Sequence, residues 1–364
     1  MRSARRRLLM ITSILVALGV VMVYSSSAIY AQETYGDAAY FLKRHLIYLA
    51  LGLVAFFAVL GIEEGRIRRW AKPLMALSLL LLMAVLIPGI GQRVSGARRW
   101  FKLGGFGFQP SELAQPAIIL YMADVLSRKR SLLRDFFQGV LPALLVMGLT
   151  VGLILVEPDL GTSVATAVVG LLLLLIAEVR WRILLPMFLS AVPAVTVLVL
   201  TKPYRMRRIM AYLNPWADPE GSGFQLIQSL VALGSGGLLG VGLGESRQKL
   251  FYLPAAHTDF IFAVIGEELG FVGVTLVLVL FGALFWYGLQ LALTAPDPFG
   301  MMTALGIVTL LTLEMLVNVG VATGAVPTKG LPLPFISYGG SAMIANLSSI
   351  AVLLNVVRPR KAVA

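Results

Sequence analysis

"LLMITSILVALGVVMV" at residues 8–23 and "LMALSLLLLMAVLI" at residues 74–87 contain no charged residue. Each run approaches the length that an α-helix needs to cross about 30 Å of hydrocarbon. Several further runs share this character. Hydrophobic residues make up 58% of the 364-residue chain, and charged residues only 13%. A water-soluble domain cannot cover so much apolar surface, so the sequence predicts an all-α, polytopic membrane protein.

The apolar runs predict ten membrane-spanning helices within a single transmembrane domain, residues 1–364. Arginines within residues 2–7 place the N-terminus in the cytoplasm by the positive-inside rule. Ten spans then return the basic C-terminal residues 358–361 to the same side. One large extracytoplasmic loop, at about 202–257, precedes span 8. The predicted spans are 9–30, 45–62, 73–90, 110–127, 139–156, 160–178, 183–201, 258–284, 301–322 and 339–357.

The composition excludes several classes of site. There is no cysteine, which excludes disulfides and cysteine-ligated metals, and His45 and His257 are the only histidines, which excludes a histidine-rich metal centre. The net charge of +12 is explained by cytoplasmic loops and anionic lipid, so no nucleic-acid partner is expected. The N-terminal segment resembles a signal peptide, but its apolar run is too long and further spans follow it, which indicates a retained first helix.

Two clusters of basic residues fall on the predicted outer side, where the positive-inside rule does not explain them. Arg98 and Arg99 lie in "RVSGARRWFK", and Arg205, Arg207 and Arg208 lie in "KPYRMRR". One interpretation is that these side chains anchor the protein to lipid phosphates of the outer leaflet. The other is a binding site for an anionic lipid-linked ligand such as a diphosphate, because the guanidinium fork donates two parallel hydrogen bonds to phosphate.

The segments rich in Pro, Gly and polar residues all fall at the predicted outer side, which suggests a functional site on that face. Each carboxylate in them also has a local explanation. Glu112 lies at the positive end of the helix that Pro110 begins, while Asp159 and Asp259 can cap the helices that follow them. A cap requires neither Glu157 nor His257. The five segments are "ARRWFKLGGFGFQPSE", "EPDLGTS", "LNPWADPEGSGFQ", "AAHTDF" and "PTKGLPLPFISYGGS".

Further carboxylates lie deeper in the predicted spans. Glu267 and Glu268 follow Asp259 by roughly 12–13 Å along a helix, and Glu314 and Asn318 share one helix face. Carboxylates at such depth face the interior of a bundle or a wet cavity. The sequence leaves open whether they form a structural polar network or line a path for a polar substrate.

The chain resembles the SEDS family (shape, elongation, division and sporulation), whose members include RodA, FtsW and SpoVE. The resemblance covers nearly the whole chain, and "SRQKLFYLP" and "VPTKGLPLPF" are closest to the FtsW branch. The matching strings are "SGARRW" (95–100), "FQPSELA" (108–114), "EPDLGTS" (157–163), the segment 205–254, "HTDFIFAVIGEELG" (257–270) and "LPLPFISYGGS" (331–341).

The resemblance implies a peptidoglycan glycosyltransferase in the bacterial cytoplasmic (inner) membrane, at the division septum. It would polymerise lipid II into β-1,4 glycan strands at the outer face, for division or for cell shape. A class B penicillin-binding protein and divisome regulatory proteins are the implied partners. The family's essential aspartate corresponds to Asp259, the expected catalytic base. The expected substrate-binding residues are Arg98, Arg99, Gln109, Ser111, Glu112, Glu157, Asp159, Arg205, Arg207, Arg208, His257, Thr258 and Lys329.

Some features depart from the family pattern or leave alternatives open. Gln115 stands where the family has a lysine that would pair with Glu112. Either another cation, Lys329 or an outer arginine, substitutes for it, or Glu112 is partly protonated and the enzyme is weakened. The sequence identifies no cofactor, although a divalent cation (Mg or Mn) held by Glu112, Glu157 or Asp159 is compatible with the chemistry. A flippase or transporter of lipid-linked sugars would need deep carboxylates instead of Asp259. A non-catalytic scaffold for a penicillin-binding protein is the third alternative.

Overall fold

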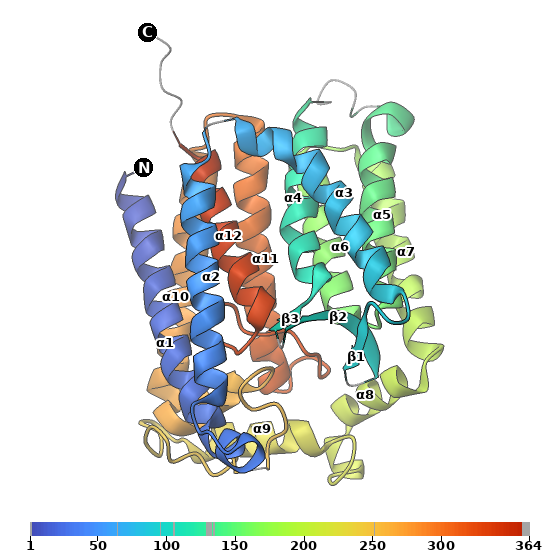
Figure 1. Ribbon diagram of the computed structural model, residues 1–364. Coiled ribbons are helices and arrows are strands. Elements are labelled where there is room, and N and C mark those ends of the chain that lie inside the picture. Colours follow the sequence, from blue (N-terminus) through green and yellow to red (C-terminus); the bar gives the residue numbers. More distant parts are fainter. Residues whose placement is uncertain are drawn as a thin grey trace.

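The computed structural model describes residues 2–63, 65–94, 96–104, 106–128, 133, 135–250 and 252–358. Arg360 and Lys361 of the predicted cytoplasmic C-terminus lie outside the described residues. The chain is mostly helical, and the long helices form an elongated bundle (Figure 1). Helix α2 packs against α12, α3 packs against α4, and α10 packs against both α11 and α1.

Each of the ten predicted spans contains a helix. These helices are α1 (Arg2–Tyr35), α2 (Tyr40–Gly61), α3 (Arg66–Leu86), α4 (Pro110–Arg128), α5 (Leu141–Val156), α6 (Leu160–Ile176), α7 (Trp181–Leu200), α10 (Ile261–Leu293), α11 (Pro298–Ala322) and α12 (Gly340–Val356). Within the described residues, six helical segments are long and apolar enough to cross a membrane: α1, α2, α3, α10, α11 and residues 136–156, which join the π-helix η2 (Phe136–Val140) to α5. Helix α1 begins and α12 ends at the same end of the bundle (Figure 1).

The expectation of an entirely helical chain is wrong at residues 92–108. Three short strands, β1 (Gln92–Val94), β2 (Ala97–Leu103) and β3 (Phe106–Phe108), form an antiparallel sheet in the order β1-β2-β3. Glycines at the two turns, Gly96 and Gly104, have φ of 82° and 54°, which glycine adopts without strain. These Gly-rich turns reverse the chain, and strand pairing satisfies the backbone groups that a loop would leave exposed.

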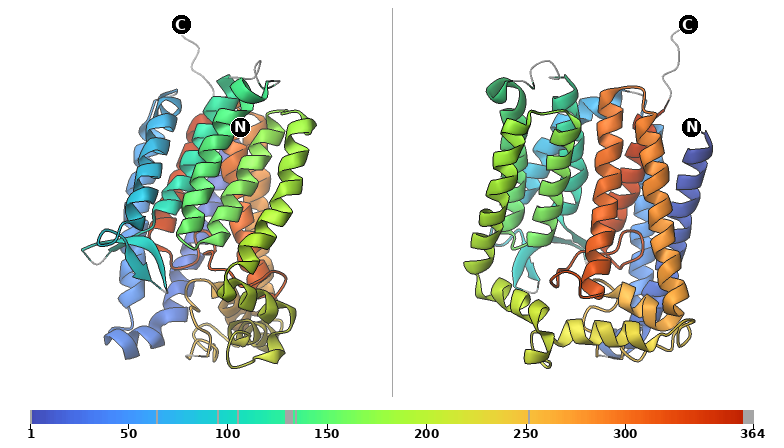
Figure 2. Two further views of the ribbon diagram at one scale, coloured as in Figure 1. Left: turned by 90° about the vertical axis from the view of Figure 1, so that its right-hand side faces the viewer. Right: turned by 180° about the vertical axis from the view of Figure 1, so that it is seen from behind.

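The predicted loop at 202–257 also contains regular structure. It includes α8 (Pro203–Leu213), a 3₁₀ turn η3 (Pro215–Ala217) and α9 (Phe224–Ser235). Figure 2 shows α8 and α9 crossing one end of the bundle, towards which the sheet also lies. The polar residues predicted to form a site therefore gather at that end.

Helix α10 is interrupted at Gly270, whose φ of 64° and ψ of −162° are not helical. Residues 237–242 hydrogen-bond the backbone groups that the interruption frees. The amides of Val241 and Gly242 donate to the carbonyls of Glu267 and Glu268, while the amides of Phe271 and Val272 donate to residues 237 and 238. Backbone groups within a bilayer must find such partners inside the protein, so the segment after α9 stabilises the interruption.

Candidate active site

Two cavities adjoin at the end of the bundle that carries α8 and α9. Cavity I has a volume of about 600 Å³ and lies among the α1–α2 turn, the sheet, α4 and the segment after α11. Cavity II has a volume of about 610 Å³ and lies between α8 and residues 327–330. Five residues line both cavities, and therefore mark their junction: Arg99, Asp159, Ala255, Asp259 and Gly330.

The backbone around Asp259 is fixed by hydrogen bonds to the segment that follows α11. The Asn318 side-chain amide donates to the carbonyl oxygens of Asp259 and Leu331, at 3.0 and 2.8 Å. The Ser337 hydroxyl donates to the carbonyl of Thr258 at 2.6 Å. Asn318, which shares a helix face with Glu314 as the spacing predicts, thus joins two chain segments far apart in sequence at the junction.

The carboxylate of Asp259 faces the junction without a hydrogen-bond partner among the described residues. The alternative interpretation of Asp259 as a helix cap is wrong, because Phe260 is the N-cap of α10 and makes no side-chain capping bond. Burial raises the pKa of Asp259 to about 6, and Arg99 and Arg208 partly oppose this shift. A carboxylate with a pKa near neutrality can accept a proton efficiently.

Asp159 lines the same junction, but its two oxygens are already engaged. It caps α6, as the sequence predicts, by accepting a hydrogen bond from the Thr162 amide at 3.1 Å. The other oxygen lies 3.2 Å from the Gln109 side-chain amide and 3.5 Å from an Arg99 nitrogen. Gln109 also donates to buried Ser111. Asp159 therefore orients Arg99 and Gln109 at the junction and is less available as a base.

The structure separates the predicted arginines according to secondary structure. Arg99 on β2 lines both cavities at their junction, while Arg98 donates to the carbonyl of Leu86 and lines neither cavity. Arg205 and Arg208 are three apart on α8 and share a helix face.

That face of α8 lines cavity II, whereas Arg207 is exposed and lines neither cavity. Arg208 donates to the carbonyl of Thr328 at 3.3 Å, beside Lys329. Buried Arg205 donates to the Leu198 carbonyl and the Tyr204 hydroxyl, at 2.7 and 2.9 Å. Cavity II therefore has a cationic wall of Arg205, Arg208 and Lys329, which suits an anionic group.

Cavity I ends in a polar region formed by α4 and α11. Glu112, Gln115 and Glu314 line it, together with Asn346 of α12. One oxygen of Glu112 and the amide nitrogen of Gln115 are buried and have no hydrogen-bond partner within the described parts of the chain. Lys329, the predicted substitute partner of Glu112, lines cavity II. The described residues form no ion pair with Glu112, and Gln115 supplies no charge.

His257 lies among aromatic rings. Its ring centroid is 4.4 Å from that of Phe41, 5.8 Å from Tyr338 and 6.0 Å from Tyr30. Burial lowers the pKa of His257 to about 4, so the imidazole is neutral at pH 7. His257 lines neither cavity, whereas Thr258 lines cavity I. The neutral ring packs against α1 and α2 and does not supply charge to the junction.

The three carboxylates considered for a divalent cation do not assemble. Glu157 is fully buried, both of its oxygens have no partner among the described residues, and it lines neither cavity. Burial raises its pKa to about 9, which favours the neutral acid over the charged ligand that a metal needs. Across the described ranges, no group of three or more His, Asp or Glu side chains could hold a metal ion. These residues do not fit a dedicated metal site, and the mechanism below uses none.

Comparisons with known proteins show the family of the chain. A family model described as "Cell cycle protein", covering FtsW, RodA and SpoVE, matches residues 5–362. The chain belongs to this family. A probable peptidoglycan glycosyltransferase FtsW of Geobacter sp. (strain M18) is 46% identical, covering 96% of this chain and 95% of the relative. Stage V sporulation protein E of Bacillus subtilis (strain 168) is 45% identical, covering 96% of each chain.

Two solved structures share the fold of this FtsW/RodA/SpoVE protein. A chain from a peptidoglycan synthase complex, described as coordinating polymerization and crosslinking, has a TM-score of 0.79 at 35% identity and covers 96% of each chain. The Rod shape determining protein RodA of Thermus thermophilus has a TM-score of 0.72 at 32% identity, covering 96% of this chain and 95% of RodA. The family and its apolar helices establish a multi-pass membrane protein.

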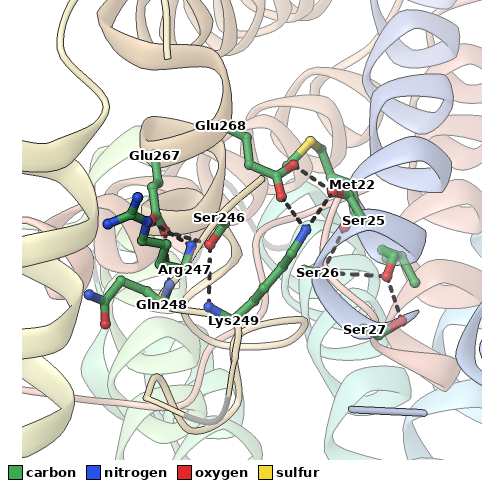
Figure 3. Close-up of polar contacts among 11 residues, drawn as sticks. Met22, Ser25, Ser26, Ser27, Ser246, Arg247, Gln248, Lys249, Glu267 and Glu268 are labelled. Carbon is green, nitrogen blue, oxygen red and sulfur yellow. Dashed lines mark hydrogen bonds and ion pairs between the residues drawn. The ribbon is translucent and has the colours of Figure 1, made fainter. Parts of the chain in front are cut away.

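In this FtsW/RodA/SpoVE protein the deep carboxylates of α10 form a structural network (Figure 3). Glu267 accepts hydrogen bonds from the Ser246 hydroxyl at 2.5 Å and from the Arg247 amide at 2.9 Å. Glu268 forms a fully buried ion pair with Lys249 at 2.8 Å and accepts from Ser25 of α1. Neither glutamate lines cavity I or cavity II. Both join the segment after α9 to the bundle, which favours the structural alternative over a substrate path.

Several residues that line cavity I were not predicted from the sequence. Tyr48 donates a hydrogen bond to the Gly107 carbonyl and accepts one from its amide, which fixes β3 against α2. Arg44, Tyr338 and Asn346 also line the cavity. Arg44 carried a usable signal, because a basic residue at the outer end of a span runs against the positive-inside rule. Tyr338 lies in the Pro-rich segment that the sequence assigned to the outer face, whereas Tyr48 and Asn346 lie in apolar helices that gave no such indication.

Proposed function

We propose that this chain is a peptidoglycan glycosyltransferase that polymerises lipid II into β-1,4 glycan strands. The observation that carries the proposal is the position of Asp259, a carboxylate without a bonded partner among the described residues, at the junction of two cavities. A polymerase must bring two substrates together at one base, and two cavities that meet at Asp259 suit this need. The names of the relatives agree with this activity.

The reaction needs one inverting displacement. The 4-hydroxyl of the acceptor GlcNAc attacks C1 of the donor MurNAc, whose bond to the diphosphate oxygen breaks as the new C1–O bond forms. The hydroxyl proton passes to Asp259, and the diphosphate leaves with the electron pair of the broken bond. General-base assistance of this kind contributes about 10²–10⁴ in rate.

The cationic wall of cavity II suits the leaving diphosphate. Arg99 at the junction and Arg208 on α8 both lie where they stabilise the charged form of Asp259. The same positive field would stabilise charge that develops on the leaving group. Cavity II would therefore hold the donor diphosphate, and cavity I would hold sugar rings across the junction.

The topology and partners follow from the same function. Ten crossings place both termini in the cytoplasm and the end with α8, α9 and the sheet outside, where lipid II is polymerised. A class B penicillin-binding protein would crosslink the strands beside it, and divisome proteins would place both at the septum. The solved peptidoglycan synthase complex that shares the fold supports such a pairing.

The decisive experiment is polymerisation of purified lipid II by the purified protein with its penicillin-binding partner. Asp259→Asn keeps the side-chain shape and removes the proton acceptor, so glycan strands should fall at least about 100-fold. Partner binding and thermal stability should stay close to wild type. Near-normal polymer from Asp259→Asn would exclude Asp259 as the base.

A matched variant separates the polymerase from the transporter. Glu314 is the deep carboxylate that lines cavity I, whereas Asp259 lies at the junction. Transport of a fluorescent lipid II across proteoliposomes, abolished by Glu314→Gln and unaffected by Asp259→Asn, would support the transporter instead. If the chain were only a scaffold, the wild type itself would form no strands in the polymerisation assay, because the partner only crosslinks them.

A further inference from the structure

Cavity I is lined by aromatic side chains as well as by Asp259. We define this aromatic lip as Tyr35, Tyr40, Trp100 and Phe101, all of which line the cavity. They come from the end of α1, the start of α2 and strand β2. The mechanism above uses none of them, although the cavity that contains Asp259 continues to them.

The first part of the lip is a rigid pair of rings. Tyr35 and Tyr40 stack with centroids 4.0 Å apart and planes within 6°. The Phe41 ring contacts both edge-on, at 5.7 and 5.3 Å. Tyr35 nevertheless remains 49% exposed. The pair therefore offers a fixed aromatic face without needing to reorganise.

The lip continues towards the sheet through contacts of Arg44 and Tyr48. The Arg44 guanidinium lies 4.8 Å from the Tyr40 ring centroid and 6.0 Å from that of Phe106 on β3. Tyr48 holds Gly107 of β3 by two hydrogen bonds. A side chain at Gly107 would come within 3.2 Å of the Trp100 ring, so this ring lies directly against the glycine. The lip therefore contains rings from α1, α2 and β2.

Two ordinary explanations account poorly for this arrangement. Tyr and Trp are common at membrane interfaces, but there they face lipid, whereas these rings line a cavity. A cavity for an isoprenoid tail would be apolar throughout, yet Gln92, Arg93 and Lys102 line the same cavity. Flat aromatic faces interleaved with polar side chains suit a ligand with apolar faces and hydroxylated edges. β-Linked pyranose rings have this chemistry.

We propose that the aromatic lip binds the sugar rings of the growing glycan strand as it extends away from Asp259. This inference rests on the proposed polymerase activity and adds a product-binding subsite to it. Stacking of pyranose faces on the Tyr35–Tyr40 pair and on Trp100 would retain the strand between successive additions. Rings from three separate elements offer faces for more than one sugar ring, as a strand requires.

Binding can be tested without catalysis. The probe is chitotetraose, a β-1,4-linked GlcNAc tetramer that has no lipid, phosphate or peptide, detected by saturation-transfer NMR on the purified protein. Tyr35→Ala should bind about 3- to 10-fold more weakly than wild type. Tyr24→Ala is the matched control, because Tyr24 lies on the same helix, is 45% exposed and lines neither cavity. Tyr35→Phe keeps the ring and should bind normally.

Further arms of the experiment separate the possible outcomes. Asp259→Asn should still bind chitotetraose, which keeps the subsite distinguishable from the polymerase activity. Trp100→Leu provides a second variant in case Tyr35→Ala misfolds. Two results would overturn the proposal. One is a wild-type protein that shows no saturation transfer at millimolar chitotetraose, and the other is equal binding of chitotetraose by Tyr35→Ala and Tyr24→Ala. Farnesyl diphosphate is a second probe, for the lipid-diphosphate part of the substrate. A Tyr35→Ala variant that bound farnesyl diphosphate more weakly but bound chitotetraose normally would also overturn the proposal.

Polymerisation distinguishes the growing strand from the incoming monomer. With lipid II as substrate, Tyr35→Ala should release shorter strands while KM for lipid II stays at the wild-type value. A higher KM with unchanged strand length would assign the lip to the monomer and overturn the strand assignment.

Discussion

Replacing Gly330 by alanine should disable Asp259 without unfolding the protein. A Cβ at Gly330 would lie 2.7 Å from Oδ2, 3.3 Å from Cγ and 3.5 Å from Oδ1 of Asp259. Ordinary van der Waals contact begins at 3.4 Å, so the nearest oxygen must move by about 0.7 Å. The backbone can accept alanine, because Gly330 is not among the residues with positive φ. The obstructing group is the end of a side chain, which can rotate away at little cost in stability.

The cost should instead appear in the rate. Misplacement of a catalytic group by about 1 Å can reduce the rate about 10²-fold, so a shift of about 0.7 Å predicts a loss of about 10- to 100-fold. This corresponds to about 1.4–2.7 kcal/mol in the activation free energy. The assay is the initial rate of strand formation from purified lipid II, with thermal unfolding in detergent measured in parallel.

Gly234→Ala is the matched control. Gly234 lies within α9, and nothing approaches a Cβ built there within 4 Å. Alanine in a helix is favoured over glycine, so this variant should keep the wild-type rate and unfold at the same or a higher temperature. If Gly330→Ala polymerises at the wild-type rate with a normal unfolding temperature, then the position of the Asp259 carboxylate does not limit the reaction.

Three further predictions concern charge. The rate should rise as pH increases through about 6, because Asp259 must be ionised to accept the proton; in Arg208→Ala, which lacks a cation that lowers this pKa, the midpoint of the pH–rate profile should move to higher pH. Lys249→Met leaves the Glu268 carboxylate buried without its ion-pair partner and should lower the free energy of unfolding by about 3–5 kcal/mol. The measurement is the unfolding temperature, and adding Glu268→Leu should recover much of the lost stability. Gln115→Lys places a cation beside the carboxylates of cavity I and should preserve or raise the polymerisation rate, so a folded but inactive variant would show that cavity I does not tolerate a cation there.

The sequence alone determined that the chain is a multi-pass helical membrane protein, and it singled out Asp259, the proposed base. Uncharged runs of helix length have one stable form in a bilayer, since a helix satisfies every backbone hydrogen bond internally. Local signals also held where they depend on adjacent residues: α4 begins at Pro110, and Asp159 caps α6. Asp259 was selected by its match to the family motif, because hydropathy and charge alone do not distinguish it from the other carboxylates.

Only the tertiary structure decided which polar residues meet. Arg98 and Arg99 are neighbours in sequence, yet the strand that contains them directs one to the end of α3 and the other to the cavities. Glu157 and Asp159 are two residues apart, yet one is sealed and the other lines the junction. Hydropathy and capping depend on neighbours along the chain, whereas a cavity wall depends on the rotation of each helix and on the paths of loops. Segments as distant as Asn318 and Asp259 fix those features through contacts that the order of residues does not specify.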